Sequence, residues 1–117
     1  MPLNNEYKSR SVGSTLTGGT TTTVYTTPTN WTAHVVVLLL VNHGNSNKTV
    51  TAEWYDTSNS TWYHIVGGYT VSGYNFLKLT DGYLVLNSGD KIRVTTEAGS
   101  SFDCTVTVEE YFDPARS

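Results

Sequence analysis

Cysteine and charged residues are both scarce in this chain of 117 residues. Cys104 is the only cysteine, so no intrachain disulfide can form and a disulfide-stapled secreted scaffold is excluded. Seven Lys plus Arg against ten Asp plus Glu give a formal charge of -3. Because the sequence lacks the basic stripe that neutralises phosphates, we expect no nucleic acid as a partner.

Long apolar segments are also missing. No run approaches the ~20 apolar residues that a membrane-spanning helix needs, so no membrane partner is expected. Residues 1–6 have neither a basic region nor a following apolar stretch, and they do not resemble a secretory signal. We therefore expect a chain that is made and kept, or assembled, in a cytoplasm.

Residue patterns that carry out chemistry are absent as well. His34, His43 and His64 do not have the spacing of zinc ligands. No Gly-x-Ser-x-Gly elbow, paired carboxylates or phosphate-binding glycine loop occurs. Cys104 alternates with polar neighbours on the apolar side of a predicted strand, where a thiol acts as a small hydrophobe. The sequence predicts a protein that is not an enzyme and needs no cofactor or metal.

One apolar run dominates what is present: residues 35–41 are seven consecutive Val and Leu residues. The run is too short for a membrane span and opens with β-branched Val, so we predict a central β-strand. Because side chains alternate along a strand, one set lines the core and the other needs a cover, from another segment or another subunit. The expected core set is Val35, Val37, Leu39 and Val41, and the set to be covered is Val36, Leu38 and Leu40.

Turn-forming residues recur every ~8–12 residues through the rest of the chain, which is typical of a sandwich. We predict an all-β fold, an antiparallel β-sandwich of about eight strands, either jelly-roll-like or immunoglobulin-like, over residues 20–117. Residues 1–19 hold little apolar surface and are predicted to form an extended N-terminal arm. We expect this arm to dock on a neighbouring copy or on the shell of a particle, by strand addition or by packing of Tyr7 and Leu16.

Aromatic residues are abundant around one predicted hairpin, in which Trp54 and Tyr55 face Trp62 and Tyr63. The Trp residues are expected to supply the core, while Tyr55 and Tyr63 are the candidates for an exposed platform. Such a platform could stack on sugars or form a protein interface, and ordinary cross-strand packing is the third interpretation.

Two stretches resemble a known group of proteins. The first is Val24-Tyr25-Thr26-Thr27-Pro28 before the apolar strand that ends in Val41-Asn42, and the second is the hairpin over residues 83–94 with its Asn87-Ser88-Gly89-Asp90 turn. Both resemble segments of small structural proteins of tailed bacteriophages. The aromatic hairpin is longer than that resemblance leads one to expect. The resemblance implies a virion component built as a β-sandwich and transfers no catalytic residues.

Two hypotheses follow. In the first, the chain is a capsid decoration (cement) protein or a neck or tail accessory protein that is assembled in the host cytoplasm and located in the virion. Its partners are then further copies of itself, a trimer being one form, and other virion proteins such as the major capsid or tail proteins. In the alternative, the chain is a carbohydrate-binding or host-adhesion module whose partner is a glycan.

Overall fold

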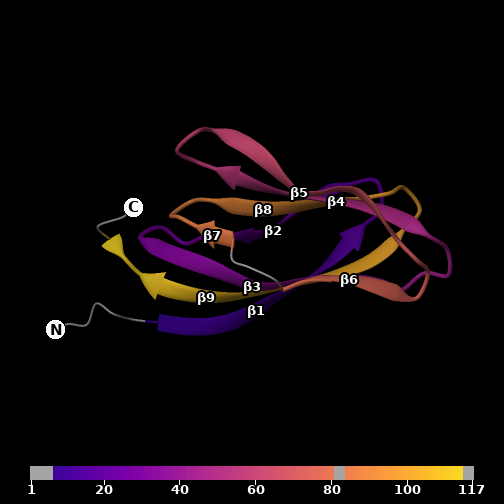
Figure 1. The fold of residues 1–117 in the computed structure, drawn as a ribbon, viewed down its shortest axis with the longest axis horizontal. Coiled ribbons are helices and arrows are strands. Elements are labelled where there is room, and N and C mark those ends of the chain that lie inside the picture. Colours follow the sequence, from indigo (N-terminus) through magenta and orange to yellow (C-terminus); the bar gives the residue numbers. More distant parts are fainter. Residues whose placement is uncertain (1–6, 81–83, 115–117) are drawn as a thin grey trace.

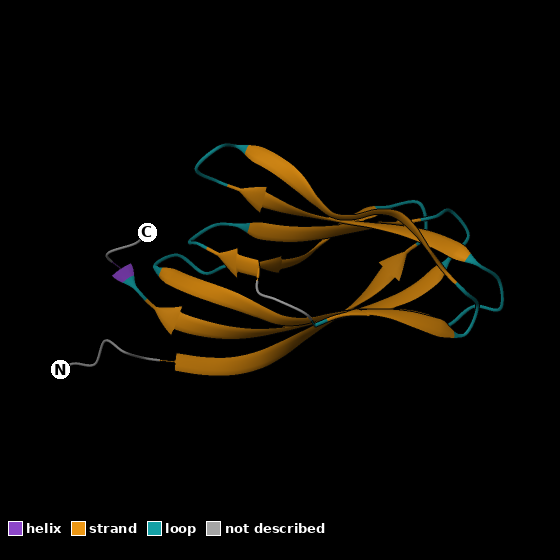
Figure 2. Ribbon diagram, viewed as in Figure 1, coloured by secondary structure: helices purple, strands orange, loops and turns teal. Residues whose placement is uncertain are grey.

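The computed structural model describes residues 7–80 and 84–114. Tyr83, with which the hairpin over residues 83–94 begins, and residues 1–6 of the predicted arm lie outside the described residues. Within the described residues, nine strands form two antiparallel sheets that pack face to face (Figure 1). Figure 2 shows that strands make up most of the described chain. The predicted all-β antiparallel sandwich of about eight strands is confirmed, with nine strands in this part of the chain.

The five-stranded sheet has the order β1-β9-β3-β6. The short strand β7 also pairs with β3, along the same edge of β3 as β6 but nearer the start of β3. Its strands are β1 (Tyr7–Thr17), β9 (Ser101–Phe112), β3 (Trp31–Asn42), β6 (Asn75–Leu79) and β7 (Leu84–Leu86). The four-stranded sheet has the order β2-β8-β4-β5. Its strands are β2 (Thr21–Thr26), β8 (Lys91–Thr96), β4 (Lys48–Asp56) and β5 (Thr61–Val71).

The central strand β3 carries a bulge that changes which side chains face the core. Its pairing with β9 shifts register between Val35 and Val37, so Val36 is the extra residue. Val35 faces inward before the bulge, whereas Leu38 and Leu40 face inward after it and are 2% and 0% exposed. The predicted alternation is therefore right only at Val35. The cover expected over Leu38 and Leu40 is supplied by the chain's own second sheet.

Strand β1 corrects the expectation that the core strands begin near Thr20. It pairs with β9 along its whole length, from Tyr7 opposite Tyr111 to Thr17 opposite Ser101. Leu16 is only 3% exposed and belongs to the core. The sparse apolar content of this segment led to the wrong prediction of an arm. An edge strand needs few inward apolar side chains when the neighbouring strand, here β9, forms its backbone hydrogen bonds.

The core lies between β9 and β3 on one side and β4 and β8 on the other. Its fully buried side chains alternate along each strand, and they include Phe102, Val106 and Val108 of β9 and Ile92 and Val94 of β8. Cys104 lies among them at 1% exposure, and burial raises the pKa of its thiol to about 12. The prediction that Cys104 is a core residue is confirmed.

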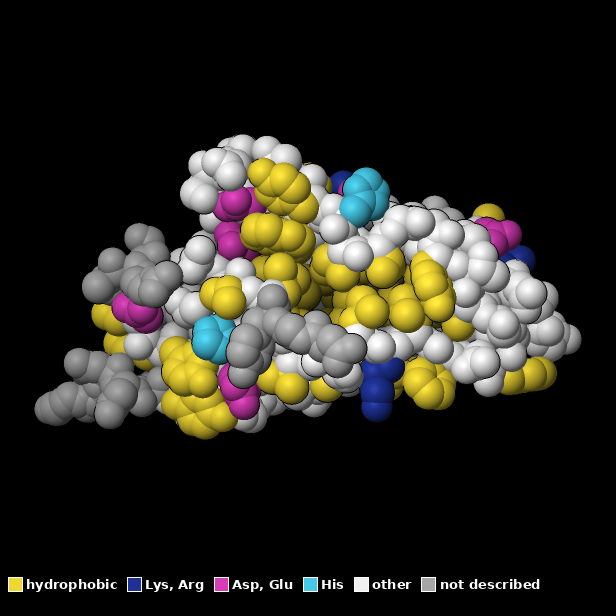
Figure 3. Space-filling model, viewed as in Figure 1, with side chains coloured by type: hydrophobic (Ala, Val, Ile, Leu, Met, Phe, Trp, Pro, Cys, Tyr) yellow, Lys and Arg dark blue, Asp and Glu magenta, His cyan; other side chains and the backbone are white. Residues whose placement is uncertain are grey.

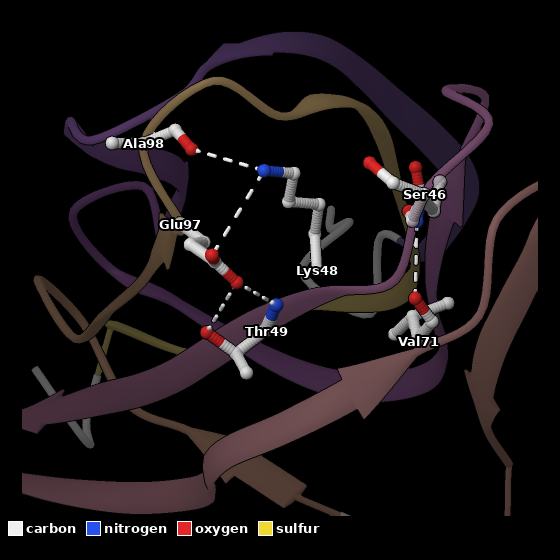
Figure 4. A network of polar contacts seen from close by, with 7 residues as sticks. Ser46, Lys48, Thr49, Val71, Glu97 and Ala98 are labelled. Carbon is white, nitrogen blue, oxygen red and sulfur yellow. Dashed lines mark hydrogen bonds and ion pairs between the residues drawn. The ribbon is translucent and has the colours of Figure 1, made fainter.

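Polar side chains fix the loops at one end of the sandwich. The fully buried Asn42 donates from Nδ2 to the carbonyl oxygens of Ser46 (2.8 Å) and Val71 (3.0 Å), which holds the β3–β4 turn against the end of β5. Figure 4 shows the neighbouring contacts, in which Thr49 donates its backbone N–H to Glu97 at 3.0 Å and the Lys48 ammonium lies 3.9 Å from the same carboxylate. These contacts tie β4 to the loop after β8.

No helix in the described part of the chain has the length and apolar content to cross a membrane.

Candidate interaction surfaces

The outward side of the five-stranded sheet carries a group of apolar side chains that we call the outer apolar face. Alternation and the β3 bulge together place these residues there, because their strand neighbours point into the core. Of the seven large hydrophobic side chains that are exposed among the described residues, four lie on this face. The face consists of Val37, Leu39 and Val41 of β3, Phe76 of β6, Val85 of β7, Tyr7 of β1 and Tyr111 of β9.

Phe76 protrudes most from this face, with 56% of its surface exposed. It lies opposite Val41 in the β3–β6 pairing, while Leu39 lies opposite Lys78. The three β3 residues of the face are half-buried by their neighbours. Phe76 and β3 thus form the apolar centre of the outward surface.

One end of the face is aromatic. The Tyr7 and Tyr111 rings are 5.0 Å apart, and the His34 ring lies 5.1 Å from Tyr111. The Tyr7 hydroxyl donates to the Glu109 carboxylate at 3.4 Å. Tyr7 is 52% exposed, so the predicted contact residue does lie at the surface, although on a strand of the sandwich itself.

Farther along β1 and β9, and across the sheet from Phe76, the outward surface is polar and hollowed. Ser11 and Thr107 hydroxyls are hydrogen-bonded at 2.8 Å. Next to them lies a shallow hollow of about 310 Å³, whose lining is Gly13, Ser14, Thr15, Asp103, Cys104 and Thr105. Gly13 has no side chain to fill it, and a Cβ built there would come no nearer than 4.0 Å to the Cys104 carbonyl oxygen.

The other predicted contact residues fall elsewhere. Leu16, Leu38 and Leu40 are in the core, so they are not available to another copy. Val36 occupies the bulge and is half-buried. Alternation alone could not find Leu39 and Val41, because no residue type in the all-apolar run marks the bulge.

The four-stranded sheet has a different outward surface, made of aromatic rings and cations. Tyr55 and Trp62 are cross-strand partners with rings 4.9 Å apart. The Arg93 guanidinium lies 3.7 Å from the Trp62 ring centroid and donates to Glu53 at 2.8 Å. Lys91 lies 5.5 Å from the Tyr55 centroid. Cations therefore already contact both rings.

The predicted platform of Tyr55 with Tyr63 is not formed. Tyr63 pairs with Trp54, their rings are 5.3 Å apart, and Trp54 packs against the core. Since Tyr55 is one residue along from Trp54, it points to the opposite side of the sheet. The predicted hairpin and its facing aromatic pairs are confirmed, but the two tyrosines belong to different faces.

A buried carboxylate joins the two sheets near the Tyr7 end. Glu110 is 0% exposed and accepts two hydrogen bonds from Arg10, at 2.9 and 3.0 Å, together with one from the Tyr25 hydroxyl. Burial acts to raise the pKa of Glu110, but the bonds from Arg10 and Tyr25 outweigh it and the pKa is lowered. Burial and the bond to Glu110 raise the pKa of Tyr25. This network holds β1 and β2 against β9.

Apolar side chains also gather between the two sheets, as Figure 3 shows for one side of the molecule. Half-buried residues that pack on the core from the strands along this seam include Ile65 and Val66 of β5 and Leu77 and Leu79 of β6. No group of three His, Cys, Asp or Glu side chains that could hold a metal ion occurs among the described residues.

Comparison with solved structures finds this fold in proteins of very different sequence. The chain is similar to VP2 of the infectious bursal disease virus subviral particle, with a TM-score of 0.56, 9% identity, and coverage of 97% of this chain and 34% of that chain. It therefore spans about a third of the length of VP2. No protein-family model matches the chain, and no curated protein matches it in sequence.

Two further similar structures are of about the same length as this chain. One is a protein of the Bacillus endospore appendages, described as disulfide-linked pili, with a TM-score of 0.55, 13% identity and coverage of 97% of this chain and 96% of that chain. The other is a chain of the cyanophage Pam1 capsid, with a TM-score of 0.51, 16% identity and coverage of 96% and 89%. At these identities the likeness shows the fold alone.

Proposed function

We propose that the chain is a non-enzymatic structural protein of a bacteriophage virion, located in the particle as a capsid decoration protein or a neck or tail accessory protein. The observation that carries this is the likeness of nearly the whole chain to a cyanophage capsid chain of similar length. The exposed apolar side chains on one sheet support the same role, because such patches mark interaction surfaces.

A pilus subunit has the same fold but fits this chain less well. The similar pili are described as disulfide-linked. This chain has one cysteine, and it is buried at 1% exposure with a raised thiol pKa. A chain with no accessible thiol cannot be linked to its neighbours in that way, so the particle role is the one proposed.

The test is quantitative mass spectrometry of purified virions from the phage that encodes the chain. We expect the chain in a fixed, multiple copy number per particle that survives density-gradient purification, together with the major capsid or tail protein to which it cross-links. Absence of the chain from washed particles would contradict the proposal.

A separate experiment with the isolated protein distinguishes the glycan-binding alternative. A glycan array probed with the labelled protein is expected to show no saturable binding, because Arg93 and Lys91 already contact the rings of Trp62 and Tyr55. Saturable binding that is lost in Trp62→Ala, without particle association, would support the adhesion role instead.

A further inference from the structure

The outward side of the five-stranded sheet, on which the outer apolar face lies, is large enough to form a stable interface. Its strands contain 11, 12, 12, 5 and 3 residues. With a rise of ~3.3 Å per residue and a strand spacing of ~4.8 Å, the whole outward side of these five strands, polar residues included, covers roughly 700 Å². Two such faces in contact would bury roughly 1,400 Å², which lies within the range of specific protein–protein interfaces.

The face has a protrusion on one side and a hollow on the other. Phe76 stands out from β6, at one side of the sheet, and the hollow beside Gly13 lies over β1, at the opposite side. Between them run β3, with half-buried apolar side chains, and β9. A two-fold axis along the strands, between β3 and β9, would exchange β6 and β1 of two copies and bring each Phe76 over the other copy's hollow.

The charges on the face fit the same arrangement. Lys78 lies on β6 beside Leu39, and Asp103 lies on β9 beside Val41 and lines the hollow. The same two-fold axis places the Lys78 ammonium of one copy over the β1–β9 side of the other, within reach of Asp103. Opposite charges therefore meet twice across the axis.

From this protrusion, hollow and charge pattern, we infer that the outer apolar face docks against the same face of a second copy of the chain. The inference deepens the proposed structural role and rests on it for the expectation that copies meet. The anchors are Phe76, Leu39 and Val41, which lose contact with water, and the polar rim is formed by the Ser and Thr side chains of β1 and β9.

The test is sedimentation equilibrium of the full chain over a range of concentrations. The wild type is expected to form a dimer, and Phe76→Ser is expected to raise its dissociation constant about tenfold or more, as for an interface anchor. Gly13→Val places a side chain in the hollow that receives Phe76 of the other copy, and it should raise the dissociation constant by a similar factor. A Cβ at Gly13 meets no atom closer than 4.0 Å, so we expect this variant to fold, and an unchanged melting temperature checks that it does.

Tyr69→Ser is the matched control, because Tyr69 is 50% exposed on β5 of the other sheet. It should leave both the dissociation constant and the melting temperature unchanged. Two results would overturn the inference: a wild type that stays monomeric at all concentrations, or a dimer that Phe76→Ser and Gly13→Val leave intact. Neither result decides the proposed function, which depends on the presence of the chain in washed virions.

Discussion

At the scale of single residues, Glu110 is a carboxylate that the fold buries completely. A carboxylate inside a core is tolerated only when charge and hydrogen bonds compensate its desolvation. Here Arg10 and Tyr25 supply three hydrogen bonds, and Arg10 itself stays 42% exposed. The network stabilises the folded state through the ionised form of Glu110.

Replacing Glu110 by Gln should lower the free energy of unfolding by ~1–3 kcal/mol at neutral pH, since charged hydrogen bonds are lost but Arg10 still reaches water. Because the pKa of Glu110 is lowered in the folded state, the greater stability of the wild type over the variant is fully present above the unfolded pKa of ~4.3. It should fade as the pH falls below about 5 and through the folded pKa. Urea denaturation at several pH values measures this, with the half-buried Glu109→Gln of the same strand as the control.

Cys104 provides a second prediction at this scale. With a pKa of about 12 and 1% exposure, its thiol should not react with an aromatic disulfide reagent at neutral pH while the chain is folded. Labelling should proceed at the rate of global unfolding and become immediate in denaturant. Fast, stoichiometric labelling of the native protein would show that β9 opens locally.

At the scale of elements, the β3 bulge decides what the apolar run does. Before Val36 the odd-numbered residues face inward, and after it the even-numbered ones do. A strand of unbroken alternation would have placed Leu39 in the core and Leu40 outside. The bulge instead gives the core Leu38 and Leu40 and leaves Leu39 on the outer apolar face.

A matched pair of substitutions checks this. Leu40→Ala should cost ~2–5 kcal/mol of stability, from lost burial and a cavity. Leu39→Ala, on the outward side, should cost well under half of that. The measurement is thermal and urea unfolding of both variants, and a larger loss for Leu39 than for Leu40 would disprove the observed register.

Strand β1 gives the second prediction at this scale. Deleting residues 2–16 should lower the melting temperature strongly, because it removes Leu16 from the core, takes Arg10 from the buried Glu110 and leaves β9 as an open edge. Circular dichroism melting measures this. Tyr7→Ser, which changes an exposed side chain of the same strand, should melt close to the wild type. An unchanged melting temperature in the deletion would mean that β1 is a dispensable arm.

At the scale of the whole molecule, the two sheets differ in what they present outward. The four-stranded sheet presents rings contacted by cations, joined by the ion pair of Arg93 and Glu53. The five-stranded sheet presents exposed apolar side chains and a hollow. Among the described residues, the five-stranded sheet therefore carries the larger share of the exposed hydrophobic side chains, and the proposed function depends on that face being covered.

The sequence by itself determined the fold class, the aromatic hairpin and the burial of Cys104, because period-two alternation and turn residues are local signals that survive without partners. The tertiary structure decided the facing of Leu38, Leu39 and Leu40, since an all-apolar run looks alike in either register and only pairing with β9 sets the bulge. It also made residues 7–17 a strand of the sandwich. Their few apolar side chains could not show that a neighbouring strand, 84 or more residues away in the chain, completes their hydrogen bonds.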